Sequence, residues 1–277
     1  MIQILLLISL INGCPLYILN NSANLPVVLI HGIISNCNNM NEMKIFLENN
    51  FNLQVVVPEI GNGIHNSFNL PLNIQGEMLC NDLNSNQLLS NGFNFIGVSQ
   101  GGLLARYYIE RCGKYQVNNL ITLVTPHGGV YKKLVGRIIN MYSTYVQEHL
   151  SIGSYWRDPF NYDKYLDVLL SNLNNEYESS NSSINLQRFS KLNNFIMVYS
   201  INDDVVSPAE SGKFSTYNIG SLDIIPYNNT IMYKGLGLDI FDKEGRISIY
   251  QTDCLHKEHT REKCFSQLYS MFQKYCT

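Results

Sequence analysis

The chain has 277 residues, which is enough for one domain with a sizeable core and an insertion. Its formal net charge of -3 at pH 7 supplies no basic surface and argues against nucleic acid as a partner. Residues 2–11 are almost wholly apolar, yet this run is too short for a stable membrane span. It is typical of a signal peptide, which we expect over residues 1–13, and the alternative is a buried N-terminal strand.

Strands and helices are predicted to alternate along the chain. Buried strands are predicted at 26–30, 53–57, 93–96, 120–124, 195–199 and 246–250, and helices at 40–49, 70–89, 99–109 and 260–275. The intervening residues 128–191 show no clear strand, so we expect an all-helical insertion there, lying over the carboxyl ends of the strands. Repeated strand–helix–strand units with continuous apolar strands predict an α/β fold with a mostly parallel sheet covered on both faces. Residues 14–277 are therefore expected to form one domain.

A G-x-S-x-G pentapeptide at residues 97–101 carries the strongest functional signal. It follows a predicted strand and opens a predicted helix, which is the setting of the nucleophile elbow of α/β-hydrolases. Glycines flank the serine there because side chains would clash with the crossing backbone. The alternative is a glycine-rich turn around an ordinary serine. The sequence predicts the α/β-hydrolase fold with Ser99 as its nucleophile.

A serine nucleophile needs a histidine base and an acid that orients the histidine, and in this fold the acid and then the histidine follow the serine. Asp203 and Asp204 follow the fifth predicted strand, and either is a candidate acid, although such a turn is also typical of solvated carboxylates. His256 and His259 follow the last strand and compete as the base. His259 begins the final helix, where a polar surface residue is expected. The spacing of the two histidines also suits metal ligands, but the Glu pattern of zinc proteases is absent, so no metal is expected.

Two backbone N–H groups are needed to stabilise the developing oxyanion. We expect them from Gln100, directly after the nucleophile, and from Ile33, where Gly32 lets the chain bend inward. His31 precedes the serine and is expected to be structural. His127 follows the strand after the elbow helix, where it can line the site, but the order of elements makes it a poor base.

The cysteines agree with entry into the secretory pathway. Seven are present, and loss of Cys14 with the signal peptide would leave an even number, which suggests disulfides. Candidate bridges join cysteines expected on neighbouring helices or across one short loop: Cys80 with Cys112, and Cys254 with Cys264. Cys37 and Cys276 have no clear assignment. No C-x-x-C pair occurs, which argues against a zinc site, and three glycosylation sequons begin at Asn20, Asn181 and Asn228.

Five segments together resemble one family: residues 28–33, the S-Q-G-G elbow at 97–102, Y-W-x-D-P at 155–159, N-D-D-V-V-S-P at 202–208, and the loop with His256. The chain resembles the palmitoyl-protein thioesterases, lysosomal enzymes that remove fatty acyl groups from cysteine. The resemblance covers nearly the whole mature chain. It implies Asp203 as the acid, His256 as the base and a Cys80–Cys112 disulfide.

The resemblance also implies an activity. We expect a lysosomal or secreted serine thioesterase without a cofactor, acting on palmitoyl-cysteine in proteins or on palmitoyl-CoA. Two features depart from the family: Val98 stands where Phe or Tyr is frequent, and residues 125–129 are similar to secreted lipases. A secreted lipase or carboxylesterase acting on oxygen esters is therefore the alternative, and a catalytically silent binding protein of the same fold is a second.

Overall fold

The computed structural model describes residues 24–131, 140–141, 143–165 and 168–277. The predicted signal peptide at 1–13, Cys14 and the sequon at Asn20 lie outside the described residues. A six-stranded sheet forms the centre, with strand order β2-β1-β3-β4-β5-β8 and every pairing parallel. Its strands are β1 (Val27–Ile30), β2 (Val55–Val56), β3 (Phe93–Val98), β4 (Val117–Leu123), β5 (Asn194–Ser200) and β8 (Ile247–Thr252). This is the α/β architecture that the sequence predicts.

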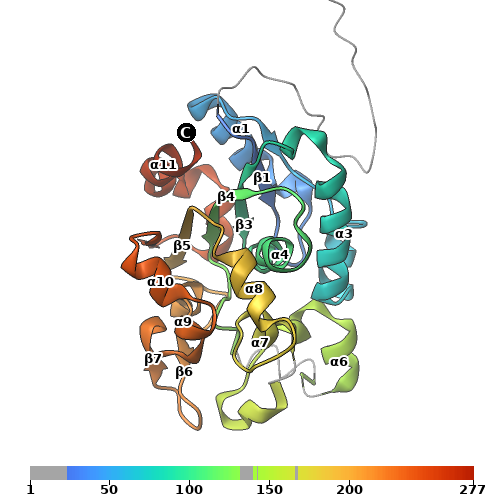
Figure 1. Ribbon diagram of the computed structural model, residues 1–277, viewed down its shortest axis with the longest axis vertical. Coiled ribbons are helices and arrows are strands. Elements are labelled where there is room, and N and C mark those ends of the chain that lie inside the picture. Colours follow the sequence, from blue (N-terminus) through green and yellow to red (C-terminus); the bar gives the residue numbers. More distant parts are fainter. Residues whose placement is uncertain (1–23, 132–139, 142, 166–167) are drawn as a thin grey trace, which may run out of the picture.

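Helices cover both faces of the sheet, as Figure 1 shows. One face packs against α1 (Asn41–Phe51) and the C-terminal α11 (Glu262–Cys276), and the other against α3 (Leu72–Ser85), α4 (Gln100–Tyr107) and α8 (Ser182–Phe189). Successive side chains of a strand point to opposite faces, so the residues of β1 alternate between the two hydrophobic cores. Every residue of β1 is fully buried, which explains its unbroken apolar sequence.

The helix predicted over 70–89 begins at Leu72 and ends at Ser85 as α3, and a short 3₁₀ turn follows at Gln87–Leu89. The short helix α2 (Ile64–Asn69) before it was not predicted. Pro71 lies between α2 and α3 and is the N-cap residue of α3. Proline has a fixed φ and no backbone N–H, so it is tolerated at the start of a helix but not within one.

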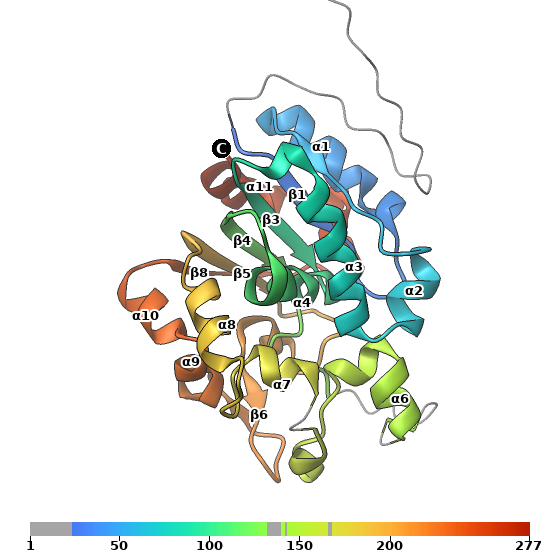
Figure 2. The same cartoon turned by 45° about the vertical axis from the view of Figure 1, so that its right-hand side comes forward.

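Two segments outside the sheet lie at one end of the molecule. We call the segment between β4 and α8 the first excursion and the segment between β5 and β8 the second excursion. Between β4 and α8 lie α6 (Thr144–His149), α7 (Leu169–Leu173) and several 3₁₀ turns, together with an isolated parallel bridge between Val130 and Trp156, so this segment is not wholly helical. Between β5 and β8 lie the antiparallel pair β6 (Thr216–Tyr217) and β7 (Ile224–Ile225), then α9 (Ile231–Gly235) and α10 (Leu238–Lys243). Figures 1 and 2 show both excursions gathered below the sheet.

Two buried ion pairs hold the first excursion in place. The Arg106 guanidinium on α4 bonds Glu110 at 2.9 Å and also donates to the side chain of Asn174 and the carbonyl of Leu173, both at 2.8 Å. Arg106 and Glu110 are fully buried. These contacts tie the helix that follows Ser99 directly to the chain around α7.

The second pair lies within the excursion itself. Arg157 donates to Glu176 through both terminal nitrogens, and Glu176 also accepts hydrogen bonds from Asn174 and Tyr162 at 2.8 and 3.0 Å. Burial alone would raise the pKa of Glu176, but the Arg157 charge and these hydrogen bonds outweigh burial and lower that pKa. Glu176 is therefore the ionised partner that compensates a buried arginine.

We expect Glu176→Gln to lower the free energy of unfolding by about 3–5 kcal/mol, because it leaves the buried Arg157 charge uncompensated. Chemical denaturation at neutral pH measures the change. Glu244→Gln is the matched control, since Glu244 pairs with Arg246 at the surface, where the loss should stay below about 1 kcal/mol. Equal losses for the two variants would contradict this assignment.

Candidate active site

The predicted site residues all follow the carboxyl ends of parallel strands. Ser99 comes directly after β3, Asp203 follows β5, and His256 follows β8. Carboxyl ends of parallel strands meet at one edge of the sheet, where α/β proteins place their ligand sites. Three segments that are far apart in the sequence thereby contribute to one place.

Ser99 occupies a strained turn between β3 and α4. Its backbone φ and ψ are 54° and -127°, a region that residues with a side chain rarely adopt. The flanking glycines permit the close approach of neighbouring backbone, because a Cβ at Gly97 would lie 2.5 Å from the Cα of Gly102. A Cβ at Gly101 would lie 2.5 Å from the carbonyl oxygen of Ile30. The turn therefore holds the serine side chain at the edge of the sheet.

A continuous chain of hydrogen bonds joins Ser99, His256 and Asp203. Both oxygens of the Asp203 carboxylate lie close to Nδ1 of His256, at 2.9 and 3.0 Å. A carboxylate only accepts, so Nδ1 carries the proton and Nε2 is left to accept from the Ser99 hydroxyl at 2.9 Å. Oδ1 of Asp203 also accepts from the backbone N–H groups of Val205 and Val206, both at 2.8 Å. These bonds orient the carboxylate toward the histidine.

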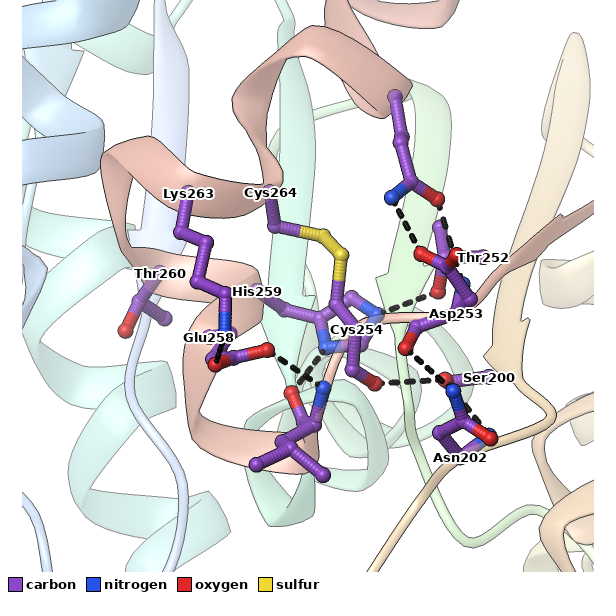
Figure 3. Close-up of a disulfide and its surroundings, with 12 residues drawn as sticks. Ser200, Asn202, Thr252, Asp253, Cys254, Glu258, His259, Thr260, Lys263 and Cys264 are labelled. Atoms are coloured by element: carbon purple, nitrogen blue, oxygen red, sulfur yellow. Dashed lines mark hydrogen bonds and ion pairs between the residues drawn. A yellow bond between two sulfur atoms is a disulfide. The ribbon is translucent and has the colours of Figure 1, made fainter.

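The two rival residues, Asp204 and His259, contact the backbone around His256. Oδ1 of Asp204 accepts from the N–H of His256 at 3.1 Å. The expectation that His259 is a polar surface residue was wrong, since its side chain is fully buried beneath the turn His256–Thr260. Figure 3 shows its ring between Thr252, at the end of β8, and the turn after Cys254. The ring bonds Thr252 at 2.8 Å, so the polar atoms of a buried imidazole are satisfied locally.

The loop after β1 lies against the elbow. A Cβ at Gly32 would lie 2.9 Å from the Cβ of Ser99, so glycine is required for this approach, and Ile33 is the next residue of the loop. His31 points elsewhere, because its Nε2 contacts the Glu59 carboxylate at 2.9 Å. Burial would raise the pKa of Glu59, but hydrogen bonds from His31 and two backbone N–H groups lower it. His31 thus belongs to a local ion pair.

The side chain of Gln100 is held by a clamp of hydrogen bonds that was not predicted from the sequence. Its amide nitrogen donates to the carbonyl of Ser67 at 2.9 Å and to Gln75 at 3.2 Å. Its amide oxygen accepts from the Tyr155 hydroxyl at 2.9 Å. Gln100 and Gln75 are both buried, so the clamp fixes the first residue of α4 from three directions. The S-Q-G-G and Y-W motifs were the available signal, since these two segments supply Gln100 and Tyr155.

His127 lies in the core and contacts other partners. Its Nε2 lies 3.0 Å from the Thr122 hydroxyl, and its ring stacks on Phe214 with centroids 4.5 Å apart. Burial lowers the pKa of His127 well below its usual range, and the positive charge of Arg106 acts in the same direction. A neutral core histidine is the consequence.

Two disulfides predicted from the sequence are present, Cys80–Cys112 and Cys254–Cys264, each with Cα atoms 6.0 Å apart. The first joins α3 to the turn after α4, and the second closes the loop that carries His256. Cys37, which the sequence left unassigned, is also disulfide-bonded. Cys276 is a free, buried thiol whose pKa burial raises to about 12.

An open apolar depression of about 500 Å³ lies beside the loop after β1. It is lined by Ile34, Asn62, Ile64, His65, Phe68 and Asn69. Ile34 and Ile64 are 61% and 47% exposed, so the depression presents apolar surface to solvent. Ile34 lies two residues after Gly32, which packs on Ser99.

In the described part of the chain, no group of three or more His, Cys, Asp or Glu side chains is arranged to hold a metal ion. Among the same residues, no helix has both the length and the apolar character needed to cross a bilayer.

Comparisons with known proteins identify the family. The family described as palmitoyl protein thioesterase matches residues 26–256. Palmitoyl-protein thioesterase 3 of Dictyostelium discoideum is 36% identical over 273 residues, covering 93% of each chain. Palmitoyl-protein thioesterase 1 of Caenorhabditis elegans is 29% identical and covers 87% of this chain and 89% of its own.

Solved structures support the fold. A lipase-esterase related protein from Clostridium acetobutylicum superposes with a TM-score of 0.53 at 12% identity, covering 94% of this chain and 98% of its own. Likeness at this level of identity shows the architecture, and the sequence matches show the family. The chain therefore has the α/β-hydrolase fold and belongs to the palmitoyl-protein thioesterase family of hydrolases.

Proposed function

We propose that this protein is a serine thioesterase that hydrolyses long-chain fatty acyl thioesters, in S-palmitoylated proteins or in palmitoyl-CoA. The observation that carries the proposal is the hydrogen-bonded chain from Ser99 through His256 to Asp203, in a member of a thioesterase family. Ser99 is the nucleophile, His256 the general base and Asp203 the acid that orients it. No cofactor is required for this chemistry.

In the acylation step, Nε2 of His256 takes the hydroxyl proton while the Ser99 oxygen attacks the thioester carbonyl carbon. The negative charge that develops on the carbonyl oxygen is stabilised by the backbone N–H groups of Ile33 and Gln100. The close packing of Gly32 on Ser99 and the clamp on Gln100 support this assignment, because both fix backbone next to the nucleophile.

Collapse of the tetrahedral intermediate breaks the carbon–sulfur bond and releases the cysteine or CoA thiolate, which takes the proton from His256. The acyl group is then held on Ser99 as an ester. A water molecule attacks this ester with His256 again as base, and release of the fatty acid restores the serine.

Acyl binding accounts for the preference for long chains. Thioesters are reactive and thiolates leave readily, so selectivity must come from contacts with the acyl chain. Burying one methylene contributes about 0.8 kcal/mol, so a palmitoyl chain gains far more than an acetyl group. The insertion at 128–191 is rich in Leu, Ile and Tyr and can supply an apolar groove for the acyl chain. The depression lined by Ile34, Ile64 and Phe68 is a second apolar surface, next to the loop after β1.

We also propose a lysosomal or secreted location. Disulfides persist in oxidising compartments, and this chain has two between described cysteines. A Drosophila melanogaster relative, 29% identical over 255 residues, is named a homolog of a lysosomal thioesterase. Asn228, which begins one of the sequons, is exposed and therefore accessible to glycosylation.

Matched substrates test the proposed reaction. Hydrolysis of palmitoyl-CoA should exceed that of a triglyceride carrying the same acyl groups, and octanoyl- and acetyl-CoA should be progressively poorer substrates. Faster cleavage of the oxygen ester would favour the lipase alternative. No turnover of either substrate, together with no labelling of Ser99 by a fluorophosphonate, would favour a silent binding protein.

A further inference from the structure

The loop that carries His256 is fastened at several points. Figure 3 shows the Cys254–Cys264 disulfide, with Ser200 and Asn202 beside it. The Ser200 hydroxyl donates to the carbonyl of Cys254 at 2.6 Å, and the Asn202 side chain donates to the carbonyl of Asp253 at 2.8 Å. These contacts hold the residues before His256, but none of them touches the His256 peptide groups.

His259 contacts that peptide directly. Its Nδ1 lies 3.2 Å from the carbonyl oxygen of His256 and 3.1 Å from that of Leu255. Carbonyl oxygens only accept, so Nδ1 must carry the proton and donate to them. Nε2 is then the acceptor for the Thr252 hydroxyl, at 2.8 Å. The surroundings therefore select one tautomer of the ring, which joins the end of β8 to the turn of the catalytic histidine.

The state of the ring agrees with this arrangement. Burial lowers the pKa of His259, so the neutral form with one donor and one acceptor is favoured. The backbone of His256 is then held at both of its peptide groups, because Asp204 accepts from the His256 N–H and His259 donates to the His256 carbonyl. Displacing this backbone would move the imidazole away from Ser99.

We infer that His259 is a positioning residue for His256, which acts by donating from Nδ1 to the backbone carbonyls that follow Cys254. The inference rests on the proposed function, since it needs His256 to be the general base. His259 has no direct part in the chemistry. It holds the turn in the position from which Nε2 of His256 reaches the Ser99 hydroxyl. Thr252 sets the orientation of the His259 ring.

Replacements at position 259 separate the effect of the hydrogen bond that His259 donates from the effect of the space that its side chain fills. In His259→Asn the amide nitrogen can occupy the place of Nδ1 and keep the donor to the carbonyls. In His259→Gln the longer side chain reaches toward Thr252, in the place of Nε2, and the donor is lost. Gln is closer to His in size, so a space-filling role ranks Gln above Asn, whereas the positioning role ranks Asn above Gln.

The measurement is kcat and KM on a palmitoyl thioester, with the rate of fluorophosphonate labelling and the melting temperature of each variant. We expect kcat to fall about ten- to a hundredfold in His259→Ala and His259→Gln, because a misplacement near 1 Å costs up to this much. KM should change less than about threefold, since no substrate contact is removed. His259→Asn should recover at least about a third of the wild-type kcat, and the labelling rates should follow the same order.

Gln267→Ala is the control for general loosening of the loop. Gln267 contacts Asp253 on the exposed side and does not touch the His256 peptide. It should lower the melting temperature and leave kcat unchanged. If His259→Ala does not fold, the ranking of kcat in His259→Asn and His259→Gln decides. Thr252→Val is a further test, because it removes the hydroxyl that orients the His259 ring.

Wild-type kcat in His259→Gln, or a higher kcat in Gln than in Asn, would overturn the inference. Wild-type protein in which Ser99 does not react with the fluorophosphonate would instead overturn the proposed function, so the two failures are distinguishable.

Discussion

Ser99→Ala should abolish turnover of palmitoyl thioesters, with kcat falling on the order of 10⁵- to 10⁶-fold as for other serine hydrolases that lose the nucleophile. The serine oxygen is the atom proposed to form the acyl-enzyme, and no other hydroxyl in the described structure lies within hydrogen-bond distance of Nε2 of His256. The fold should persist, because alanine adds no atoms to the tight turn. Steady-state kinetics measures the loss of turnover, and fluorophosphonate labelling measures the loss of the reactive serine hydroxyl.

The matched control for this variant is Ser90→Ala, in which the lost hydroxyl belongs to an exposed serine after the 3₁₀ turn Gln87–Leu89. It should retain full activity and labelling. If Ser99→Ala keeps more than about a tenth of the wild-type rate, the nucleophile is a different group.

Asp203→Asn should lower kcat about 10⁴-fold, as expected when the acid of such a triad is neutralised. An amide at this position offers an N–H toward Nδ1 of His256 and favours the wrong tautomer, in which Nε2 can no longer accept the serine proton. The two backbone bonds to Oδ1 of Asp203 can be kept by the amide oxygen, so the loop should remain folded. The pH dependence of kcat reports the change of tautomer at His256. The melting temperature reports whether the loop remains folded.

Asp204→Asn is the neighbouring comparison and should cost less than about tenfold, because the amide oxygen can still accept from the N–H of His256. The reverse ranking of the two variants would assign the acid to Asp204.

The sheet could be predicted from sequence because five of its six strands are short, buried and largely apolar runs. The edge strand β8 is mostly half-buried. The observed bounds of the six strands differ from the predicted ones by at most three residues. The β6–β7 pair was missed because two-residue strands have no periodicity to detect. The short helix α2 was also not predicted, and the start of α3 was placed two residues early although Pro71 marks it.

The candidate site could be predicted only in part. The elbow at Ser99 combines glycines with a strand–helix setting, and the order of the other members follows from the fold. Asp203 and Asp204 are adjacent on one turn, so composition cannot tell which carboxylate faces His256, and the family resemblance was needed. The burial of His259 could not be foreseen, because its partners are backbone carbonyls made available by a local turn. The catalytic roles themselves stay predictions.

The clamp on Gln100 joins the first excursion to the proposed oxyanion site. Tyr155 belongs to the chain between β4 and α8, yet its hydroxyl bonds the residue whose backbone N–H is proposed to stabilise the oxyanion. Substitutions in this excursion would therefore alter turnover as well as acyl preference. Exchanging the first excursion between relatives would transfer acyl-chain-length specificity without loss of turnover only if the residues at positions 155 and 100 were exchanged together.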